Sequence, residues 1–224
     1  MSDIINSIFK NRKVNLSKLE SFGFMRNERC YNYRRILSES GLELTVSVTE
    51  QGKVSSEIID TDLGEEYTLH LSDGAVGSFV GEVRREYEEI LTQIAGLCFD
   101  MDVFKSVQAG KLIDYVKNIY GDKPEYLWEK FPDNAVLRRK DTGKWYGALL
   151  TVSKRKLGIP SDETAEIIDL HVPPEELEAI VDNKTYFPGY HMNKKHWLTV
   201  ILDGSVADGE IFRRIDESYS LAVK

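Results

Sequence analysis

A stretch of twenty residues in the first half of the chain restricts the fold more than any other. From Ser78 to Leu97, apolar residues recur at the spacing of one helical face: Phe79, Val80, Val83, Tyr87, Ile90, Leu91, Ile94 and Leu97. Most charged residues of the stretch fall on the opposite side. A helix with this pattern needs an apolar surface to cover. We therefore predict a helix that Ser78 caps and that packs against a sheet formed by the preceding residues.

The residues before this helix have the pattern of a small antiparallel sheet. Leu42 to Val48 alternates apolar and polar residues, which is typical of a half-buried strand. Further strands are predicted at 31–36, 54–59 and 67–71, with turns at 38–41, 51–53 and 62–64. His70 would lie in the last strand, as a structural or exposed histidine. With short helices predicted at 2–9 and 16–22, residues 1–100 form a helix–sheet–helix module.

The second half repeats this mixture of elements after a boundary at residues 100–107. A helix is predicted from Gln108 to Tyr120, with Ile113 and Ile119 on its apolar face and Gly121 ending it. A hairpin joins 135–140 to 144–152, and further elements are predicted as strands at 164–172 and 198–202 and helices from 173 and at 208–218. We predict an α+β protein of two modules, 1–100 and 108–224, each an antiparallel sheet with helices packed on one side.

The overall composition fits a globular chain and limits the classes of function. The net charge is −8, from 29 basic and 37 acidic residues, which weakens a simple electrostatic case for nucleic acid. Residues 102–156, however, carry 12 basic and 7 acidic residues, a local charge of +5. No apolar run is long enough for a transmembrane helix, and the first residues lack the pattern of a signal peptide. Cys30 and Cys98 imply neither a disulfide framework nor a four-cysteine zinc site, so we expect a cytoplasmic protein.

One stretch of the second half concentrates polar and aromatic residues at the start of a strand. Residues 188–197 read PGYHMNKKHW, and strand-forming residues follow at once. Together with WEKFP at 128–132, KWY at 144–146, Lys154 with Leu157-Gly158, and DGSV at 203–206, this block resembles the MmcQ/YjbR family. The resemblance runs from about Gln108 to Val223. It implies a fold of the CyaY/frataxin-like superfamily, and members of the family are commonly described as DNA-binding proteins.

The basic residues of this half are the candidate DNA contacts, because Lys and Arg neutralise phosphates. His, Asn and Trp side chains of the PGYHMNKKHW block could contact phosphates or bases. The predicted contacts to double-stranded DNA are Arg138, Arg139, Lys140, Lys144, Lys154, His191, Asn193, Lys194, Lys195, His196 and Trp197. Arg155 and Lys156 continue the basic run. A charged, solvated strand edge is the alternative interpretation of the hairpin lysines.

Three other functions are weaker candidates. A metal site could use His191, His196 and Asp203, but His residues five apart need not converge, and the acidic residues are dispersed, so no metal or other cofactor is expected. The chain has no GxSxG, P-loop, HExxH or GxGxxG pattern, so we expect no catalysis, although Glu129 and His191 remain chemically capable. An adaptor that docks an acidic protein partner would use the same lysines as DNA would.

Overall fold

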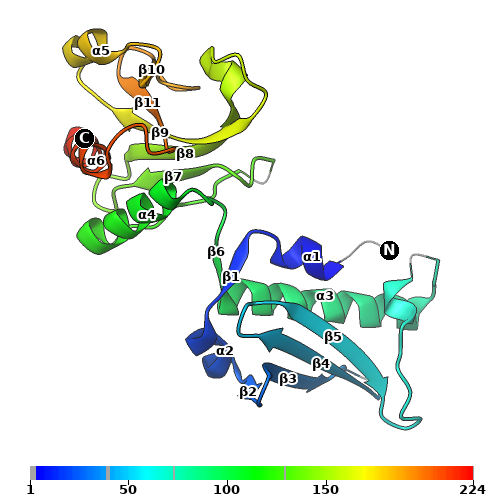
Figure 1. Ribbon diagram of the computed structural model, residues 1–224. Helices are drawn as coiled ribbons and strands as arrows, with labels where there is room; N and C mark the ends of the chain where they lie inside the picture. Colours follow the sequence, from blue (N-terminus) through cyan, green and yellow to red (C-terminus); the bar gives the residue numbers. More distant parts are fainter. Residues whose placement is uncertain (1–3, 39–40, 73, 129, 224) are drawn as a thin grey trace. The chain divides into compact units, whose positions relative to one another are not determined.

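The computed structural model describes residues 4–38, 41–72, 74–128 and 130–223. Outside this range lie positions 2–3 of the first predicted helix, 39–40 of the first predicted turn, and Glu129, the catalytic candidate in the WEKFP run. The chain divides into two compact units, Met1–Val103 and Phe104–Lys224. The α+β fold class is confirmed, because each unit combines helices with an antiparallel sheet (Figure 1).

The N-terminal unit consists of one four-stranded sheet, a short strand pair and helices. Its strands have the order β2-β3-β4-β5 and all neighbours are antiparallel. A separate pair, β1 with β6, joins the two ends of the unit. The elements are α1 (Ile4–Phe9), β1 (Arg12–Val14), α2 (Leu16–Phe22), β2 (Met25–Arg26), β3 (Cys30–Ile36), β4 (Leu42–Thr49), β5 (Val54–Asp60), the 3-10 turn η1 (Leu69–Leu71), α3 (Ser78–Cys98) and β6 (Phe99–Met101).

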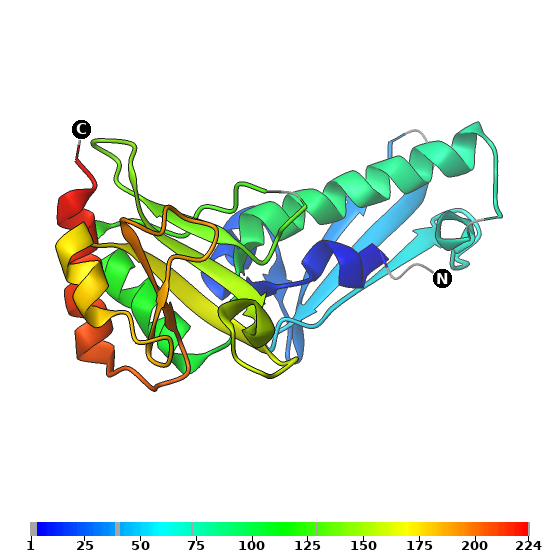
Figure 2. The same ribbon diagram turned by 90° about the horizontal axis from the view of Figure 1, so that it is seen from above.

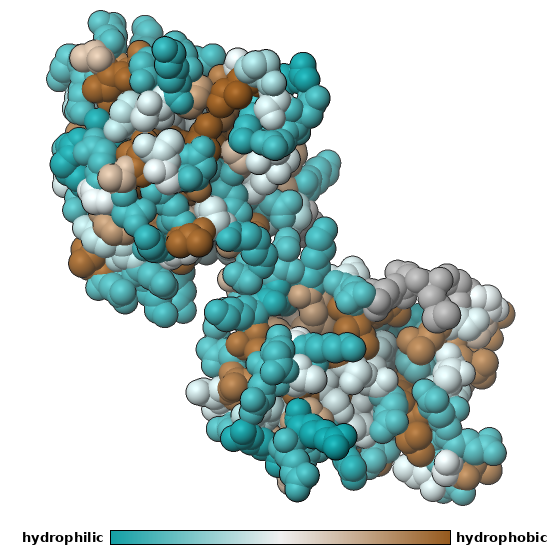
Figure 3. All heavy atoms as spheres, viewed as in Figure 1, coloured by the Kyte–Doolittle hydropathy of each residue, from teal (hydrophilic) through white to brown (hydrophobic). Residues whose placement is uncertain are grey.

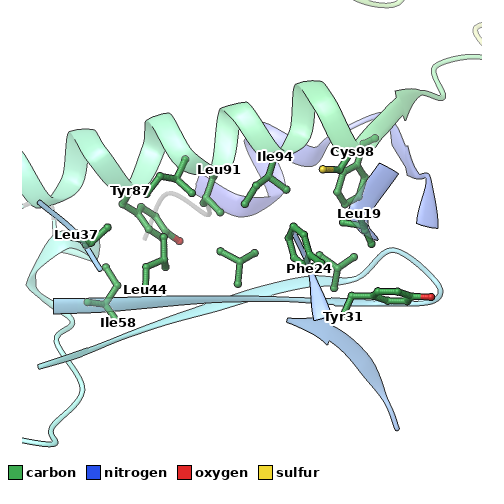
Figure 4. Packing of buried hydrophobic residues seen from close by; sticks show 14 of the residues in the cluster. Leu19, Phe24, Tyr31, Leu37, Leu44, Ile58, Tyr87, Leu91, Ile94 and Cys98 are labelled. Atoms are coloured by element: carbon green, nitrogen blue, oxygen red, sulfur yellow. The ribbon is translucent and has the colours of Figure 1, made fainter. Parts of the chain in front are cut away.

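Helix α3 covers the sheet, as its apolar stripe predicts, and runs along the strands in Figure 2. Figure 4 shows Tyr87, Leu91 and Ile94 pointing from the helix into the core, with Tyr87 above Leu44 and Ile58 and Ile94 above Phe24. Two details of the prediction are wrong. Phe79 and Leu97 are 46% and 56% exposed, because they fall at the margin of the stripe. The helix begins at Ser78, but Gly77 occupies the cap position and no side chain caps it.

The predicted strand at 67–71 is also wrong. The inward residues of the segment, Tyr67 and His70, are three apart rather than two, and Leu69 and Leu71 are exposed. His70 packs its ring against Tyr87, with ring centroids 4.7 Å apart. Arg84 of α3 donates to the carbonyl of His70 at 3.0 Å, so a side chain takes the bond that a neighbouring strand would otherwise provide. The segment therefore closes as a 3-10 turn, and His70 is structural.

The C-terminal unit holds a five-stranded antiparallel sheet of order β10-β11-β9-β8-β7. The predicted hairpin is confirmed as β7 and β8. The elements are α4 (Val107–Tyr120), β7 (Ala135–Arg138), β8 (Trp145–Ser153), the 3-10 turn η2 (Lys154–Leu157), β9 (Thr164–His171), α5 (Pro174–Ile180), β10 (Tyr186–Pro188), β11 (Trp197–Ile201) and α6 (Asp208–Leu221).

Helices α4 and α6 lie together on one face of this sheet (Figures 1 and 2). Ser106 caps α4 by accepting from the amide of Ala109, and Gly121 ends the helix with a φ of 70°, as predicted. Ile119, predicted on the apolar face of α4, is 58% exposed. Tyr120 of α4 stacks on Tyr219 of α6, and Tyr146 of β8 packs edge-on against both rings. Its neighbour Trp145 contacts Trp128 instead, so the sheet has a second face without these helices.

The surface of both units is mixed. Figure 3 shows hydrophilic residues over most of the visible face, with hydrophobic residues in small groups between them. Among the helices that the structure describes, none combines the length and the apolarity needed to cross a membrane.

Candidate functional site

The PGYHMNKKHW block forms the loop between β10 and β11, and a close backbone contact fixes its base. The amide of Gly189 donates to the carbonyl of Trp197 at 2.7 Å. A Cβ atom at position 189 would lie 2.6 Å from the Cβ of Trp197 and 2.8 Å from its carbonyl oxygen. Only glycine fits there without movement of the backbone. The Pro-Gly pair therefore closes the loop, and the residues between 190 and 196 project from a fixed base.

Asn193 shapes the tip of this loop. Its carbonyl oxygen accepts from the amides of His196 and Trp197, and its side-chain oxygen accepts from the amide of Lys195. Lys194 and Lys195 are exposed at the turn, and among the described residues neither forms an ion pair. Of this group of predicted DNA contacts, the two lysines face solvent, whereas Asn193 is occupied in forming the turn.

The two aromatic residues at the end of the loop pack on the protein. Trp197 is half-buried, and its ring lies 5.1 Å from that of His171 on β9. His196 is also half-buried beside His171, and its carbonyl accepts from the amide of Val172. His191 differs, because it is exposed and its backbone has a φ of 58°, a left-handed conformation that is uncommon outside glycine. Of the three predicted contacts, His191 is the most accessible.

Most of the predicted contacts on the β7–β8 hairpin are paired with acids. Arg138 lies 3.1 Å from Glu125. The Nζ of Lys140 lies 3.5 Å from Asp122 and donates to the carbonyl of Gly121 at 2.7 Å. Arg139 binds Asp141 through two nitrogens, at 2.9 and 2.6 Å, and donates to the carbonyl of Tyr219 at 2.8 Å. Its guanidinium also lies over the Tyr219 ring. Arg139 therefore ties the hairpin to α6.

Lys144 is the exception on this hairpin. It is exposed and forms no ion pair within the part of the chain that the structure describes. Of the predicted contacts on this hairpin, Lys144 is therefore the cation that is available to an external anion.

The basic run after β8 divides in the same way. Lys154 and Arg155 pair with Glu163 and Asp162, at 2.7 and 2.8 Å. Their side chains face acids of the segment that leads into β9. Lys156 is exposed and unpaired among the described residues. One cation of three is therefore available to an external anion.

A cavity of about 570 Å³ lies on the sheet face away from α4 and α6. Four aromatic side chains line it: Trp128, Phe131, Trp145 and Tyr190. Ala148, Leu150 and Val152 of β8 supply apolar floor. We call this cavity the aromatic pocket. Small-molecule sites commonly have a volume of about 300–1,000 Å³ and a mostly apolar lining.

Unpaired lysines surround the aromatic pocket. Lys130 and Lys156 line its wall, and Lys156 and Lys194 line an adjoining hollow that shares Tyr190 and His191 with the pocket. We call Lys130, Lys156 and Lys194 the lysine rim; all three are exposed, and the structure gives them no ion pair among described residues.

Sequence reasoning missed Lys130. It allows a pocket lined by Trp128, Phe131, Trp145 and Tyr146 but favours core packing for these rings, and the structure places Tyr146 in the core and the other three in the pocket. The signal available was the high density of Trp and Phe beside prolines. That density does not reveal that the rings converge from separate segments.

A buried carboxyl group lies beneath the loop end of the pocket. Asp169 of β9 is fully buried, and it pairs across the sheet with Ala148 on one side and Thr199 on the other. Its Oδ1 accepts from the Thr199 hydroxyl and from the Tyr190 amide, whereas Oδ2 has no hydrogen-bond partner among the described residues. Burial raises the pKa of Asp169 to about 7, and the bonds to Oδ1 oppose this shift. A polar residue inside the apolar run EIIDLHV was the sequence signal for this group.

Within the described residues, no three His, Cys, Asp or Glu side chains gather closely enough to hold a metal ion. Burial raises the pKa of the Cys98 thiol to about 11. Cys98 lies in the core of the N-terminal unit.

Comparison with known proteins identifies relatives of the C-terminal half. A family model described as YjbR matches residues 118–221. The uncharacterized protein YyaQ of Bacillus subtilis is 37% identical over 110 residues, which span 49% of this chain and 93% of YyaQ. The uncharacterized protein YjbR of Escherichia coli is 39% identical over 62 residues, 27% of this chain and 52% of that protein.

A solved structure is similar as well. The crystal structure of a Pseudomonas syringae protein is 42% identical, and the match covers 50% of this chain and 97% of that one, with a TM-score of 0.49. The family model and the similarity to YyaQ confirm the predicted MmcQ/YjbR resemblance. The relation to the CyaY/frataxin-like superfamily stays a prediction.

Proposed function

The chain belongs to the YjbR family, and we propose that its C-terminal unit binds DNA weakly, mainly through phosphates, without catalysis. The observation that supports this function is the lysine rim. Lys130, Lys156 and Lys194 are exposed, unpaired among the described residues, and placed around connected hollows of one surface. Lys195 extends this surface by one exposed cation.

Unpaired ammonium groups favour phosphate binding for a physical reason. A lysine that already holds a carboxylate must give up that partner before it binds a phosphate, whereas a solvated lysine only displaces water and counterions. The relevant cations are therefore those of the lysine rim with Lys195 and Lys144, rather than Arg138, Arg139, Lys140 or Lys154. The total charge of −8 opposes binding only partly, because charges farther than about 10 Å are largely screened at 0.1 M salt.

Fluorescence anisotropy of a labelled random-sequence duplex tests the proposal. The full chain is titrated into the duplex at a low and at a physiological salt concentration. We expect binding that weakens steeply with salt. Each phosphate contact contributes about −0.9 to the slope of log affinity against log salt. Lys194→Glu with Lys195→Glu should remove most of the binding and lower the magnitude of the slope by about 2.

A matched control carries the same change of charge elsewhere. Lys10→Glu with Lys117→Glu alters two exposed lysines outside this surface, and we expect it to bind nearly as the parent does. Equal loss of binding in both double variants would mean that the total charge matters and the surface does not. Parent-like binding by the Lys194→Glu, Lys195→Glu protein would show that DNA binds elsewhere on the protein than at these lysines.

An acidic protein partner would meet the same lysines and is the second candidate. Absence of binding to both duplex and single-stranded DNA at low salt would reject the DNA proposal. A pull-down with the parent and the Lys194→Glu, Lys195→Glu variant would then ask whether an acidic protein is captured by the parent alone.

A further inference from the structure

The aromatic pocket is too apolar for a surface that contacts phosphates alone. Its cavity of about 570 Å³ is lined by two indole rings, Trp128 and Trp145, which meet edge to face with centroids 5.8 Å apart. Phe131 lines the same cavity while 60% exposed. A large apolar side chain exposed beside a hollow commonly marks a binding site.

The charges around the pocket restrict the kind of ligand. Lys130 and Lys156 supply two unpaired positive charges, His191 is exposed beside them, and Asp133 is the one carboxylate among the described lining residues. An apolar aromatic interior below a positive rim fits a flat ring system that carries a phosphate. It does not fit a neutral lipid chain, which would leave the lysines unused, or a simple inorganic anion, which would leave the rings unused.

The interior also contains polar groups that could contact the edge of a ring. Asn134 and Thr151 line the pocket. Beneath its Tyr190 end lies Asp169, a fully buried carboxyl group with one oxygen unpartnered among the described residues. A buried polar atom without a partner is uncommon, and it commonly reflects a function or an unseen ligand. These polar groups indicate that the pocket binds a ligand that has polar atoms as well as an apolar surface.

We propose that the aromatic pocket holds one unpaired base of a DNA strand while Lys130 and Lys156 contact the phosphates beside that base. This inference rests on the proposed DNA-binding function and specifies what the site recognises. A base in a duplex is stacked and paired, so it can enter the pocket only after that energy is lost. A single strand presents its bases without this cost, and base–aromatic stacking does not require a particular sequence. The protein therefore prefers single-stranded to duplex DNA.

The expected size of this preference is about tenfold, because one stacked base contributes enough energy for a factor of that order. The experiment compares a labelled single-stranded 12-mer with the same 12-mer in a duplex, by anisotropy with the full chain. Pocket occupancy is read separately from tryptophan emission. The chain has three tryptophans. Trp128 and Trp145 line the pocket, whereas Trp197 does not. A Trp197→Phe chain therefore leaves the two pocket indoles as the reporters, and single strand should quench them.

Two variants separate base insertion from phosphate binding. Phe131→Ser should abolish the preference for single strand and leave duplex affinity within about twofold of the parent, because Phe131 is exposed and carries no charge. Lys156→Gln should lower the affinity for both single-stranded and duplex DNA. Phe79→Ser, which alters another phenylalanine that is 46% exposed but lies on α3, is the matched control and should change neither affinity.

The possible outcomes are distinct. A tenfold preference with quenching that Phe131→Ser removes supports the pocket. Equal affinity for both forms, without quenching, overturns the pocket inference and leaves the phosphate-binding function standing. Absence of binding to either form at low salt overturns the DNA function and this inference together.

Discussion

Asp169 and Thr199 are direct neighbours across strands β9 and β11, and the Thr199 hydroxyl donates to the Asp169 carboxyl group in a fully buried part of the sheet. The pair holds the β10–β11 loop, because the Tyr190 amide donates to both side chains, at 3.2 and 2.9 Å. The loop that carries Lys194 and Lys195 is therefore anchored on a carboxyl group whose pKa is raised to about 7.

The first prediction concerns pH. A folded-state pKa above the unfolded value means that the native state retains a proton that the unfolded chain has lost, so this contribution to stability falls as pH rises toward 7. Between pH 5 and pH 8 Asp169 should lower the free energy of unfolding of the C-terminal unit by about 2 to 3 kcal/mol. Asp169→Asn keeps the Oδ1 acceptor and should remove this slope. Urea unfolding followed by tryptophan emission measures it, since all three tryptophans lie in this unit.

The comparison with Asp169→Asn also corrects for the histidines. Burial lowers the pKa of His70 and His171, which adds a slope of opposite sign below about pH 6.5 in both proteins. The difference between parent and variant isolates the carboxyl group. Identical pH slopes in the two proteins would show that Asp169 is ionised throughout this range.

A second prediction concerns Gly189. Gly189→Ala places a new Cβ against the Cβ and the carbonyl oxygen of Trp197. Neither of these two Trp197 atoms lies at the flexible end of a side chain, so the clash requires movement of the backbone. We expect a loss of about 1–3 kcal/mol in the unfolding free energy of the C-terminal unit. Gly110→Ala is the control, because open space surrounds Gly110 in α4 and alanine should stabilise that helix by about 0.5–1 kcal/mol. Parent-like stability of Gly189→Ala would mean that the loop relaxes freely.

A third prediction separates two cations of one hairpin. Arg139→Gln should lower the urea midpoint of the C-terminal unit, because it removes the bonds to Asp141 and to the Tyr219 carbonyl. Lys144→Gln should leave the midpoint unchanged, since Lys144 has no ion pair among the described residues, and should weaken duplex binding instead. Measurement of both properties for both variants checks this contrast. The reverse assignment would place Arg139 on the DNA-binding surface.

A fourth prediction concerns an isolated C-terminal fragment. The sequence suggests residues 108–224, but that fragment lacks Ser106, which caps α4, and Phe104, whose ring stacks on Tyr126. The amides of Lys105 and Ser106 also donate to Glu166, at 2.6 and 2.9 Å. We expect fragment 104–224 to fold and to exceed 108–224 in stability by at least about 1 kcal/mol, the usual effect of a helix cap. Equal urea midpoints would contradict this, and a molten spectrum from both would mean that the unit depends on the rest of the chain.

Local sequence patterns were sufficient to predict most elements and insufficient to predict the site. The β7–β8 hairpin is confirmed because Asp141-Thr142-Gly143 specifies a turn between two strand-forming runs. The segment at 67–71 failed because the inward side chain is a histidine held by α3, a tertiary contact without a local signature. The aromatic pocket needs Trp128, Trp145 and Tyr190 together, and their convergence depends on the order of strands in the sheet.

Charge pairing was equally invisible in the sequence. Arg139 and Lys144 are five residues apart and look alike as a pattern, yet one is bound to Asp141 and the other faces water. The predicted DNA contacts therefore remain a hypothesis whose members differ in availability.

The ion pairs beside η2 have a consequence for how this surface could change. Asp162 and Glu163 hold Arg155 and Lys154, so loss of these two acids would leave three consecutive cations, 154–156, facing solvent. The local positive potential of residues 154–156 is thus neutralised by two neighbouring carboxylates, and the acidic isoelectric point of the chain gives no sign of it. Two substitutions at carboxylates, with no new lysine or arginine, would be enough to turn a weakly attractive face into a strongly attractive one.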